Sequence, residues 1–251
     1  MSGRDLLRTR GSGAAGVLVE LGLVAIAVAC NAVVRWYTLD DGAVAAAHAR
    51  DVLELQQALG LDWERPMQDA ALAAGWVSGF ASWFYVWGYL PVLAAALVGL
   101  FVWRPAAYAV LRNALLAAGV VGLLCYALYP TAPPRLLDLG YADTVAADGL
   151  GATARPVGIA NEIAAIPSFH IAYLVVIAVV VFGATRSRAL RVACVVEPVL
   201  MSWAVVVTGN HWVLDVPAGA LLALVGLAVA GRIRDRARRP AGEPTSRALA
   251  G

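Results

Sequence analysis

Long apolar segments, each about as long as a membrane crossing requires, dominate this sequence. A transmembrane helix needs about 20 mostly apolar residues, and the segments of that kind are 16–36, 84–103, 113–129, 169–185, 191–209 and 211–231. Apolar residues make up 61% of the chain and charged residues 14%, whereas soluble domains average about 45–50% and about 25%. The sequence therefore predicts an all-α membrane protein with six transmembrane helices, and it excludes a soluble nucleic-acid-binding protein.

The first apolar segment follows Arg4, Arg8 and Arg10, as the core of a secretory signal would. A signal core is usually about 7–15 residues long, but this segment continues from Gly16 to Val34. We therefore expect an uncleaved first transmembrane helix.

The positions of the arginines predict how the chain crosses the membrane. All 19 basic residues are Arg, and the net charge is +2. Cytoplasmic segments collect basic residues, and the clusters here comprise Arg4, Arg8, Arg10, Arg104, Arg112, Arg186, Arg188, Arg191, Arg232, Arg234, Arg236, Arg238 and Arg239. If all clusters are cytoplasmic, both termini are cytoplasmic as well. We expect a cytoplasmic segment 1–15, one catalytic six-helix domain 16–231 in the plasma (inner) membrane, and a basic, disordered cytoplasmic tail 232–251.

This topology places residues 37–83 outside the cell. Residues 67–83 are apolar but contain Ser78, Gly79 and Ser82, so they are either a further span or a helix lying against the membrane surface. The topology favours the surface position. In residues 43–61 apolar and charged residues alternate at helical spacing, which predicts an outer, interfacial amphipathic helix.

Three polar motifs fall on the predicted outer side. The stretch Tyr-Pro-Thr-Ala-Pro-Pro-Arg closes the third span and ends at Arg135, Pro-Ser-Phe-His opens the fourth and ends at His170, and Asn-His-Trp-Val-Leu-Asp opens the sixth and ends at Asp215. The Pro- and Gly-rich loop 130–168 between the first two is long for a passive connection, and long ordered loops are usually functional. Ionisable groups at membrane depth are candidates for function.

The pair His211 and Asp215 has the spacing of one helical turn, which places both on one face of a helix. A hydrogen bond to the carboxylate would fix the imidazole tautomer and leave the other ring nitrogen free as a nucleophile or base. His170, at a helix start, is suited to act as the complementary acid. Isolated, each histidine would be an interfacial residue, but together on one side of the membrane they indicate a catalytic site.

A phosphate is the substrate group that fits the remaining residues. Ser168 is placed to cap the helix that begins beside it, whose free N–H groups would bind an anion. Arg135 offers a permanently charged fork for phosphate oxygens. The main alternative is a metal bound by His211 and Asp215, but no further ligand accompanies them at metal-site spacing. We expect neither a metal nor a cofactor.

These motifs resemble the three signatures of the type 2 phosphatidic acid phosphatase superfamily, an Arg-Pro element, a Pro-Ser-x-His element and a His-x-x-x-Asp element. The Pro-Thr-Ala-Pro-Pro-Arg and Asn-His-x-x-x-Asp stretches are most similar to the inositol phosphorylceramide synthase-like branch (inositolphosphotransferase-like). The resemblance extends loosely over residues 51–231. It implies a nucleophilic His211 that forms a phosphohistidine, an orienting Asp215, and a His170 that protonates the leaving oxygen and later activates the acceptor. The residues that it implies for holding phosphoryl oxygens, without a metal, are Arg135, Ser168 and Asn210.

The sequence also departs from the superfamily pattern. The phosphatases carry Ser-Arg where this chain has Ala204 and Val205, and a Lys where it has Leu128. The missing arginine favours the transferase-like branch. A His associated with the start of the second span in that branch corresponds to Tyr89, and Tyr85 is a further possible substrate contact, with a place in the interfacial aromatic belt as its alternative.

The remaining intramembrane polar residues have structural interpretations. Glu20 and Glu197 are either substrate contacts or, as we favour, inter-helix hydrogen bonds and a kink at Pro198. Tryptophans near the outer boundary are typical of an interfacial belt, and they are Trp36, Trp63, Trp83 and Trp212.

The sequence thus predicts lipid metabolism by an integral-membrane phosphotransferase or phosphatase (transferase or hydrolase) acting on a lipid-linked phosphate from the extracytoplasmic face. A polyol or lipid hydroxyl as acceptor makes it a transferase, which is favoured, and water makes it a phosphatase. A non-catalytic lipid-phosphate carrier is a further alternative, but binding alone requires no oriented nucleophile. A proton-coupled transporter would need ionisable residues through the full membrane depth, whereas here they gather at one side. The oligomeric state, the lipid and the acceptor have no signature in the sequence.

Overall fold

A computed structural model describes residues 13–156 and 160–238 of the chain. Apart from an isolated bridge between Thr131 and Ala164, the described elements are all helical, as predicted. They are α1 (Ala14–Tyr37), α2 (Gly42–Leu59), α3 (Glu64–Ala73), α4 (Trp76–Trp87), α5 (Leu90–Trp103), α6 (Pro105–Leu128), the 3-10 helix η1 (Pro134–Leu136), α7 (Thr144–Ala147), α8 (Gly151–Ala154), α9 (Phe169–Ala184), α10 (Arg188–Val207) and α11 (Asp215–Arg238).

Five stretches of the described chain are long and apolar enough to cross a membrane. They are Ala14–Tyr37, Trp76–Trp103, Pro105–Leu128, Arg188–Val207 and Asp215–Ala237. The remaining expected span corresponds to α9, which is apolar but has only 16 residues. The chain is therefore an all-helical membrane protein, and a sixth crossing by α9 stays a prediction.

Several predicted boundaries were wrong. The second span begins at Trp76 and not at residue 84, and it consists of α4 and α5 with a break at Gly88 and Tyr89. The helix continues through Ser78 and Ser82 because both side chains are buried, and the Ser82 hydroxyl donates to Thr144 Oγ1 at 3.1 Å. A polar interruption in the sequence is therefore part of a helix interface.

Arg112 was predicted to lie in a cytoplasmic connection, but it is inside α6, which begins eight residues earlier than the predicted third span. Its side chain is buried against α1, where its guanidinium lies 2.6 Å from the Glu20 carboxylate. Glu20 also accepts a hydrogen bond from Tyr108 at 2.7 Å. The favoured inter-helix interpretation of Glu20 is confirmed, because this pairing satisfies both charges where water is excluded.

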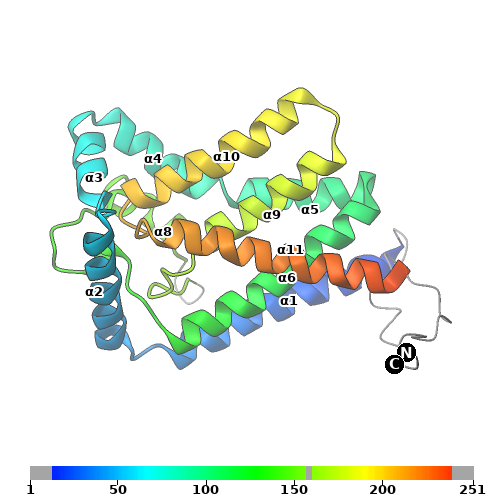
Figure 1. Cartoon of the computed structure of the whole chain (residues 1–251), viewed down its shortest axis with the longest axis horizontal. Helices are drawn as coiled ribbons and strands as arrows, with labels where there is room; N and C mark the ends of the chain where they lie inside the picture. Colours follow the sequence, from blue (N-terminus) through cyan, green and yellow to red (C-terminus); the bar gives the residue numbers. More distant parts are fainter. Residues whose placement is uncertain (1–12, 157–159, 239–251) are drawn as a thin grey trace, which may run out of the picture.

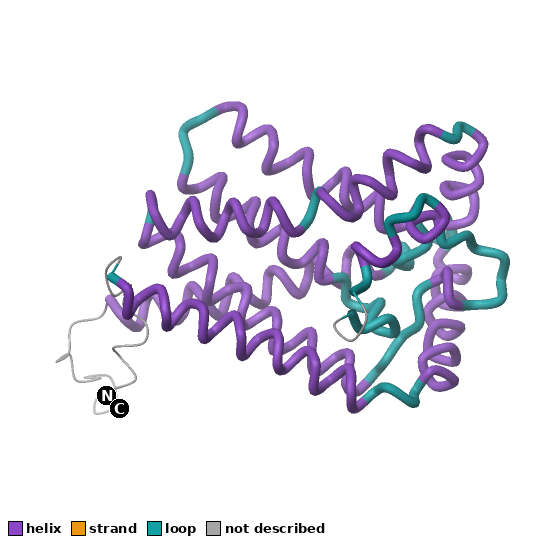
Figure 2. The backbone as a smooth tube through the Cα atoms, turned by 180° about the vertical axis from the view of Figure 1, so that it is seen from behind, coloured by secondary structure: helices purple, strands orange, loops and turns teal. Residues whose placement is uncertain are grey.

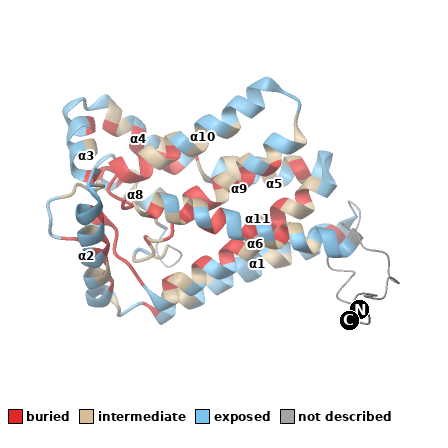
Figure 3. Ribbon diagram, viewed as in Figure 1, coloured by how far each residue is buried: buried red, intermediate tan, exposed pale blue. Residues whose placement is uncertain are grey.

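The centre of the bundle consists of α6, α9 and α11, which run side by side (Figures 1 and 2). Glycines permit their close approach: a Cβ at Gly219 of α11 would lie 2.5 Å from the Ser168 carbonyl, and one at Gly226 would lie 2.5 Å from the Ala114 carbonyl. Buried residues concentrate in these helices and in the loops at one end of the bundle (Figure 3). The α1 helix packs on the outside of α6 and exposes most of its apolar side chains.

The outer segment lies across the end of the bundle that carries the long loops. There α2 runs roughly perpendicular to the central helices (Figure 1) and buries one face, formed by Ala45, Ala49, Val52 and Gln56. This face packs against the protein's own loops, including Ala132 and Leu137. The position of α2 relative to a membrane surface stays a prediction.

The helix α11 continues to Arg238, whereas the sequence predicted a disordered tail from residue 232. The rest of that tail, residues 239–251, and the N-terminal arginines Arg4, Arg8 and Arg10 lie outside the described residues.

Candidate active site

Three segments that are distant in sequence meet at the loop-bearing end of the bundle. The Thr131 N–H donates to the Ile163 carbonyl at 2.8 Å, and the Ala165 N–H donates to the Thr131 carbonyl at 3.1 Å. The Ser168 N–H in turn donates to the Asp215 carbonyl at 3.3 Å. These bonds join the segment after α6, the start of α9 and the start of α11. The sequence motifs are therefore brought together as expected, and the residues placed there are Tyr85, Tyr89, Arg135, Ser168, His170, Asn210, His211 and Asp215.

The turn between α10 and α11 carries His211. It begins at Gly209, whose φ of 69° is in the left-handed region that favours glycine. A Cβ at this position would also lie 2.8 Å from the Ala142 carbonyl. Trp212 follows His211, and its indole Nε1 donates to the Ala132 carbonyl at 2.9 Å. Trp212 is fully buried, so its predicted place in an interfacial belt was wrong.

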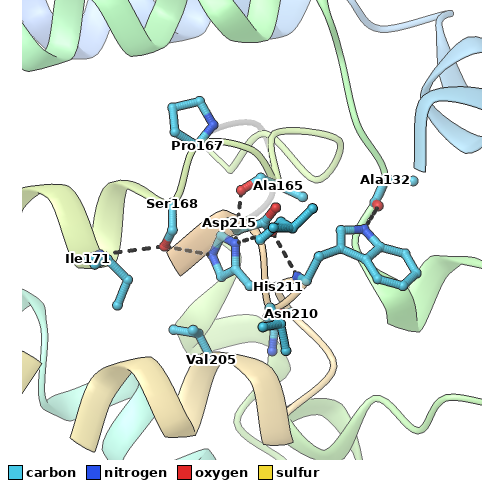
Figure 4. A network of polar contacts seen from close by, with 12 residues as sticks. Ala132, Ala165, Pro167, Ser168, Ile171, Val205, Asn210, His211 and Asp215 are labelled. Atoms are coloured by element: carbon cyan, nitrogen blue, oxygen red, sulfur yellow. Dashed lines mark hydrogen bonds and ion pairs between the residues drawn. The ribbon is translucent and has the colours of Figure 1, made fainter. Parts of the chain in front are cut away.

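The hydrogen bonds of His211 define the tautomer of its imidazole (Figure 4). Its Nδ1 lies 3.0 Å from Asp215 Oδ2 and 2.9 Å from the Ala165 carbonyl oxygen. Because both partners are acceptors, Nδ1 must carry the proton. In the neutral imidazole, Nε2 then has a free lone pair, and it lies 3.3 Å from the Ser168 hydroxyl.

Asp215 orients His211 in a different way from the one predicted. The two residues do not share a helix face, because α11 begins at Asp215 and His211 lies in the preceding turn. The fully buried carboxylate accepts the Trp212 N–H at 2.8 Å as well as the His211 proton. Its position at the helix N-terminus is favourable for a negative charge. The turn thus fixes both the histidine and its carboxylate.

His170 lies beside His211, in the first turn of α9. Their ring centroids are 5.7 Å apart, in an edge-on arrangement. The His170 ring also packs against Tyr85 at 4.8 Å and Tyr89 at 4.5 Å, between centroids. Tyr85 comes from α4 and Tyr89 from its junction with α5, so the break in that span places Tyr89 against His170. Ser168 caps α9 by accepting the Ile171 N–H.

Arg135 and a second arginine converge on Asn210. Arg135 Nε donates to Asn210 Oδ1 at 2.9 Å, and Arg155 donates to the same oxygen at 3.0 Å. Arg155 also pairs with Asp143 at 2.6 Å, while Arg135 lies 3.8 Å from that carboxylate. Burial lowers the pKa of the Arg135 guanidinium, and the charge of Arg155 lowers it further. Two guanidinium groups therefore meet at the amide oxygen of Asn210, the residue before His211, with Asp143 as their shared carboxylate.

Sequence reasoning missed Arg155, because it belongs to no motif and stands alone in the middle of a long loop. It also missed three buried polar side chains of the outer segment, Gln56, Glu64 and Gln68. Gln56 accepts the Leu214 N–H at 2.8 Å, and Glu64 accepts the Val213 N–H at 2.7 Å. The available signal for Gln56 was a polar residue on the otherwise apolar buried face of α2, whereas Glu64 and Gln68 lie in a polar segment that offers no such signal.

Gln68 holds the other side of the same turn. Its amide nitrogen donates to the carbonyls of Val207 at 2.9 Å and Ala142 at 3.0 Å, and its oxygen accepts the Ala142 N–H at 2.8 Å. Burial raises the pKa of the neighbouring Glu64. The outer segment is therefore a support for the His211 turn.

The other predicted candidates lie elsewhere. Glu20 is bound within the α1–α6 interface, away from these loops. Glu197 is inside α10, and its Oε1 is buried with no hydrogen-bond partner among the described residues. Neither residue belongs to the site. Among the described residues there is also no group of three or more His, Cys, Asp or Glu side chains placed to hold a metal ion.

Comparisons with known proteins agree with this arrangement. The solved structure of LpxE from Aquifex aeolicus shares the fold, with a TM-score of 0.53 and 20% sequence identity over 68% of this chain and 94% of that chain. No curated protein sequence matches the chain. The family model of the PAP2 superfamily matches residues 50–229, a region that begins in α2 and includes all three motifs. The chain therefore belongs to the PAP2 superfamily.

Proposed function

We propose that this protein is an integral-membrane enzyme that acts on a lipid-linked phosphate through a phosphohistidine at His211. The observation that carries the proposal is the pair of acceptors at His211 Nδ1, Asp215 Oδ2 and the Ala165 carbonyl oxygen. Together they keep the proton on Nδ1 and leave the lone pair of Nε2 facing Ser168. A histidine that only bound phosphate would instead need a protonated Nε2 that donates a hydrogen bond to a phosphate oxygen.

The first step joins His211 Nε2 to phosphorus and breaks the bond from phosphorus to the leaving oxygen. As that oxygen departs, it takes a proton from His170, whose ring lies within 5.7 Å of the His211 ring between centroids. In the second step neutral His170 removes a proton from the acceptor hydroxyl, whose oxygen attacks phosphorus and releases Nε2. Both histidines return to their starting protonation states.

The phosphoryl oxygens would be held by Arg135, Asn210, the Ser168 hydroxyl and the free N–H groups at the start of α9. The Ser168 hydroxyl lies 3.3 Å from His211 Nε2. When substrate binds, this hydroxyl can turn to a phosphoryl oxygen and leave the lone pair free to attack. Tyr85 and Tyr89, which pack on the His170 ring, would contact the leaving group. This set supplies positive charge and donors without a metal or cofactor.

The acceptor is water in a phosphatase and a hydroxyl in a transferase. Membership of the PAP2 superfamily supports the phosphatase. The transferase, including an inositol-phosphate-like transfer of the kind found in the inositol phosphorylceramide synthase-like branch, was favoured because an arginine is missing at Ala204 and Val205. In the folded chain Arg155 lies beside Arg135 and supplies a second arginine. The lack of an arginine at positions 204 and 205 therefore no longer favours the transferase over the phosphatase.

An extracytoplasmic active site is part of the proposal. The junction of α5 and α6, the connection from α9 to α10, and the end of α11 lie at the end of the bundle opposite α2, α3 and the long loops (Figure 1). The arginines of these three places would therefore be on one side, and basic residues favour the cytoplasm. Both termini would then be cytoplasmic and the site would face outward.

The function is tested by incubating the purified full chain with phosphatidic acid or another lipid phosphate and measuring phosphate release, with and without inositol or glycerol. The wild type should release phosphate or form a new phosphodiester, and the ratio of these products identifies the acceptor. His211→Ala should form neither. His48→Gln is a matched control, because the third histidine of the chain stacks on Tyr129 outside the site. Product formation by His211→Ala would contradict the proposal.

A further inference from the structure

Arg155 is the most unexpected component of the site. Its guanidinium and that of Arg135 bond the same oxygen, Asn210 Oδ1, at 3.0 and 2.9 Å, so the two like charges are held close together. Their side chains are only 12% and 5% exposed. Two positive charges in such a position repel each other unless an anion lies between them. An arrangement of this kind needs a negatively charged partner.

Asp143 is such a partner. Its Oδ2 lies 2.6 Å from Arg155 and 3.8 Å from Arg135. Glu162, which is half exposed, lies 3.6 Å from Arg135 as a second, more hydrated counter-ion. The Asp143 carboxylate thus lies within 4 Å of both guanidinium groups.

The position of Arg155 is built into the fold. It follows α8, and the preceding α7 is anchored to α4 by the bond between Ser82 and Thr144. Val145 of α7 is fully buried in the same core cluster as Tyr85. The other carboxylate oxygen of Asp143 accepts the Ala146 N–H at 3.0 Å and caps α7. Arg155 is therefore presented to Asn210 by packed secondary structure.

We propose that Arg155 is a second phosphate-binding residue and that Asp143 is its counter-ion, which the substrate phosphate must compete with or displace. This inference rests on the proposed function, since it names a further ligand of the same phosphate. Arg155 would bind oxygens on the Asn210 side of the phosphoryl group, with Arg135 beside it. Asp143 would keep the arginines in place while no substrate is bound.

A purely structural role for the Arg155–Asp143 ion pair predicts a different pattern of effects on phosphate binding. If Arg155 only pairs with Asp143 to hold the loop, removing either partner breaks the same bond and both changes act in the same direction. If Arg155 binds phosphate, its removal weakens binding, whereas removal of the competing Asp143 charge strengthens it. Asp143→Asn keeps an oxygen to cap α7, so the local helix can be preserved while the charge is lost.

The experiment measures binding of inorganic phosphate to the detergent-solubilised full chain by calorimetric titration. Arg155→Gln should raise the Kd at least about tenfold, since hydrogen bonds to charged groups contribute about 1.5–3 kcal/mol. Arg155→Lys should fall between Gln and the wild type, because it keeps the charge but loses the fork. Asp143→Asn should lower the Kd by about 3- to 10-fold. Arg50→Gln, at an exposed arginine of α2, is the matched control and should leave the Kd unchanged.

An unchanged Kd in Arg155→Gln, or weaker binding in both Arg155→Gln and Asp143→Asn, would overturn this inference and leave the proposed function intact. Absence of saturable phosphate binding in the wild type would overturn both. Gel filtration and tryptophan fluorescence confirm that each variant is folded before its Kd is used.

Discussion

The Glu64 carboxylate accepts a hydrogen bond from the backbone N–H of Val213, 149 residues later in the chain, at 2.7 Å. The same oxygen accepts the Gln56 amide at 2.6 Å, so one buried carboxylate ties both outer helices to the turn that carries His211. The outer segment therefore supports the turn on which the proposed nucleophile lies. Its removal would leave the N–H groups of that turn without partners.

Glu64 should make stability depend on pH. Burial raises its pKa above the ordinary value of 4.5. Because the folded chain then binds more protons than the unfolded chain, the free energy of unfolding should fall as pH rises from about 4.5 through the folded pKa. Glu64→Gln, which keeps an oxygen for Val213, should flatten this dependence of the thermal midpoint in detergent. Asp69→Asn, on the exposed side of α3, should keep the wild-type slope. An unchanged slope in Glu64→Gln would contradict this assignment.

His170→Ala should affect substrates according to their leaving groups. General acid catalysis typically contributes about 10²–10⁴-fold, so kcat/KM for a lipid phosphate with an alkoxide leaving group should fall by that amount. For nitrophenyl phosphate, whose leaving group needs no proton, kcat/KM should fall less than about tenfold. Its kcat should fall further, because breakdown of the intermediate still needs a base. Equal loss of kcat/KM for both substrates would show that His170 is not the acid.

Activity should survive metal chelation. In the proposed mechanism, Arg135, Arg155 and the N-terminus of α9 supply the positive charge that a metal would otherwise provide. Preincubation with EDTA should leave the rate within about twofold of the untreated enzyme. Loss of activity that Mg²⁺ or Zn²⁺ restores would favour a metal at His211 and Asp215 instead.

The orientation in the membrane can be tested by cysteine labelling. In a background with Cys30, Cys125 and Cys194 replaced by Ala, Asp148→Cys in the loop between α7 and α8 should react with an impermeant maleimide on intact cells. Ala189→Cys, at the start of α10, should react only after the cells are permeabilised. Both positions are exposed, so access depends on the membrane alone. The reverse pattern would place the active site in the cytoplasm.

Features encoded in local sequence could be predicted. Apolar runs predicted the long helices. Short motifs predicted the candidate residues Arg135, His170 and His211. The two histidines could be recognised because Ser168, Asn210 and Asp215 lie within a few residues of them in the sequence. The start of α6 could not be predicted in this way. In the sequence, Arg112 marks the boundary before the apolar segment 113–129. Its place inside α6 depends on the ion pair with Glu20 of α1, which the local sequence does not show.

Contacts between segments that are distant in the chain could not be predicted from the local sequence. Arg155 lies outside the motifs, in a loop of 39 residues from Pro130 to Ser168, and its position depends on Asn210, 55 residues away. Glu64 is similarly an ordinary charged residue in a polar segment until Val213 is placed against it. Hydrogen bonds of this kind depend on tertiary packing, which periodicity and spacing do not describe.

The most direct measurement of the central claim is the site of covalent phosphate after reaction with nitrophenyl phosphate. In His170→Ala, which should form the intermediate but lack the base for its breakdown, acid-labile phosphate should accumulate on His211 and be found there by mass spectrometry. The further change His211→Ala should abolish it. Asp215→Asn should slow its formation by about 10²–10⁴-fold, because the carboxylate charge that keeps the proton on His211 Nδ1 is lost. Phosphate on His170 in the wild type, phosphate retained after His211→Ala, or no labelled protein under these conditions would contradict a His211 nucleophile.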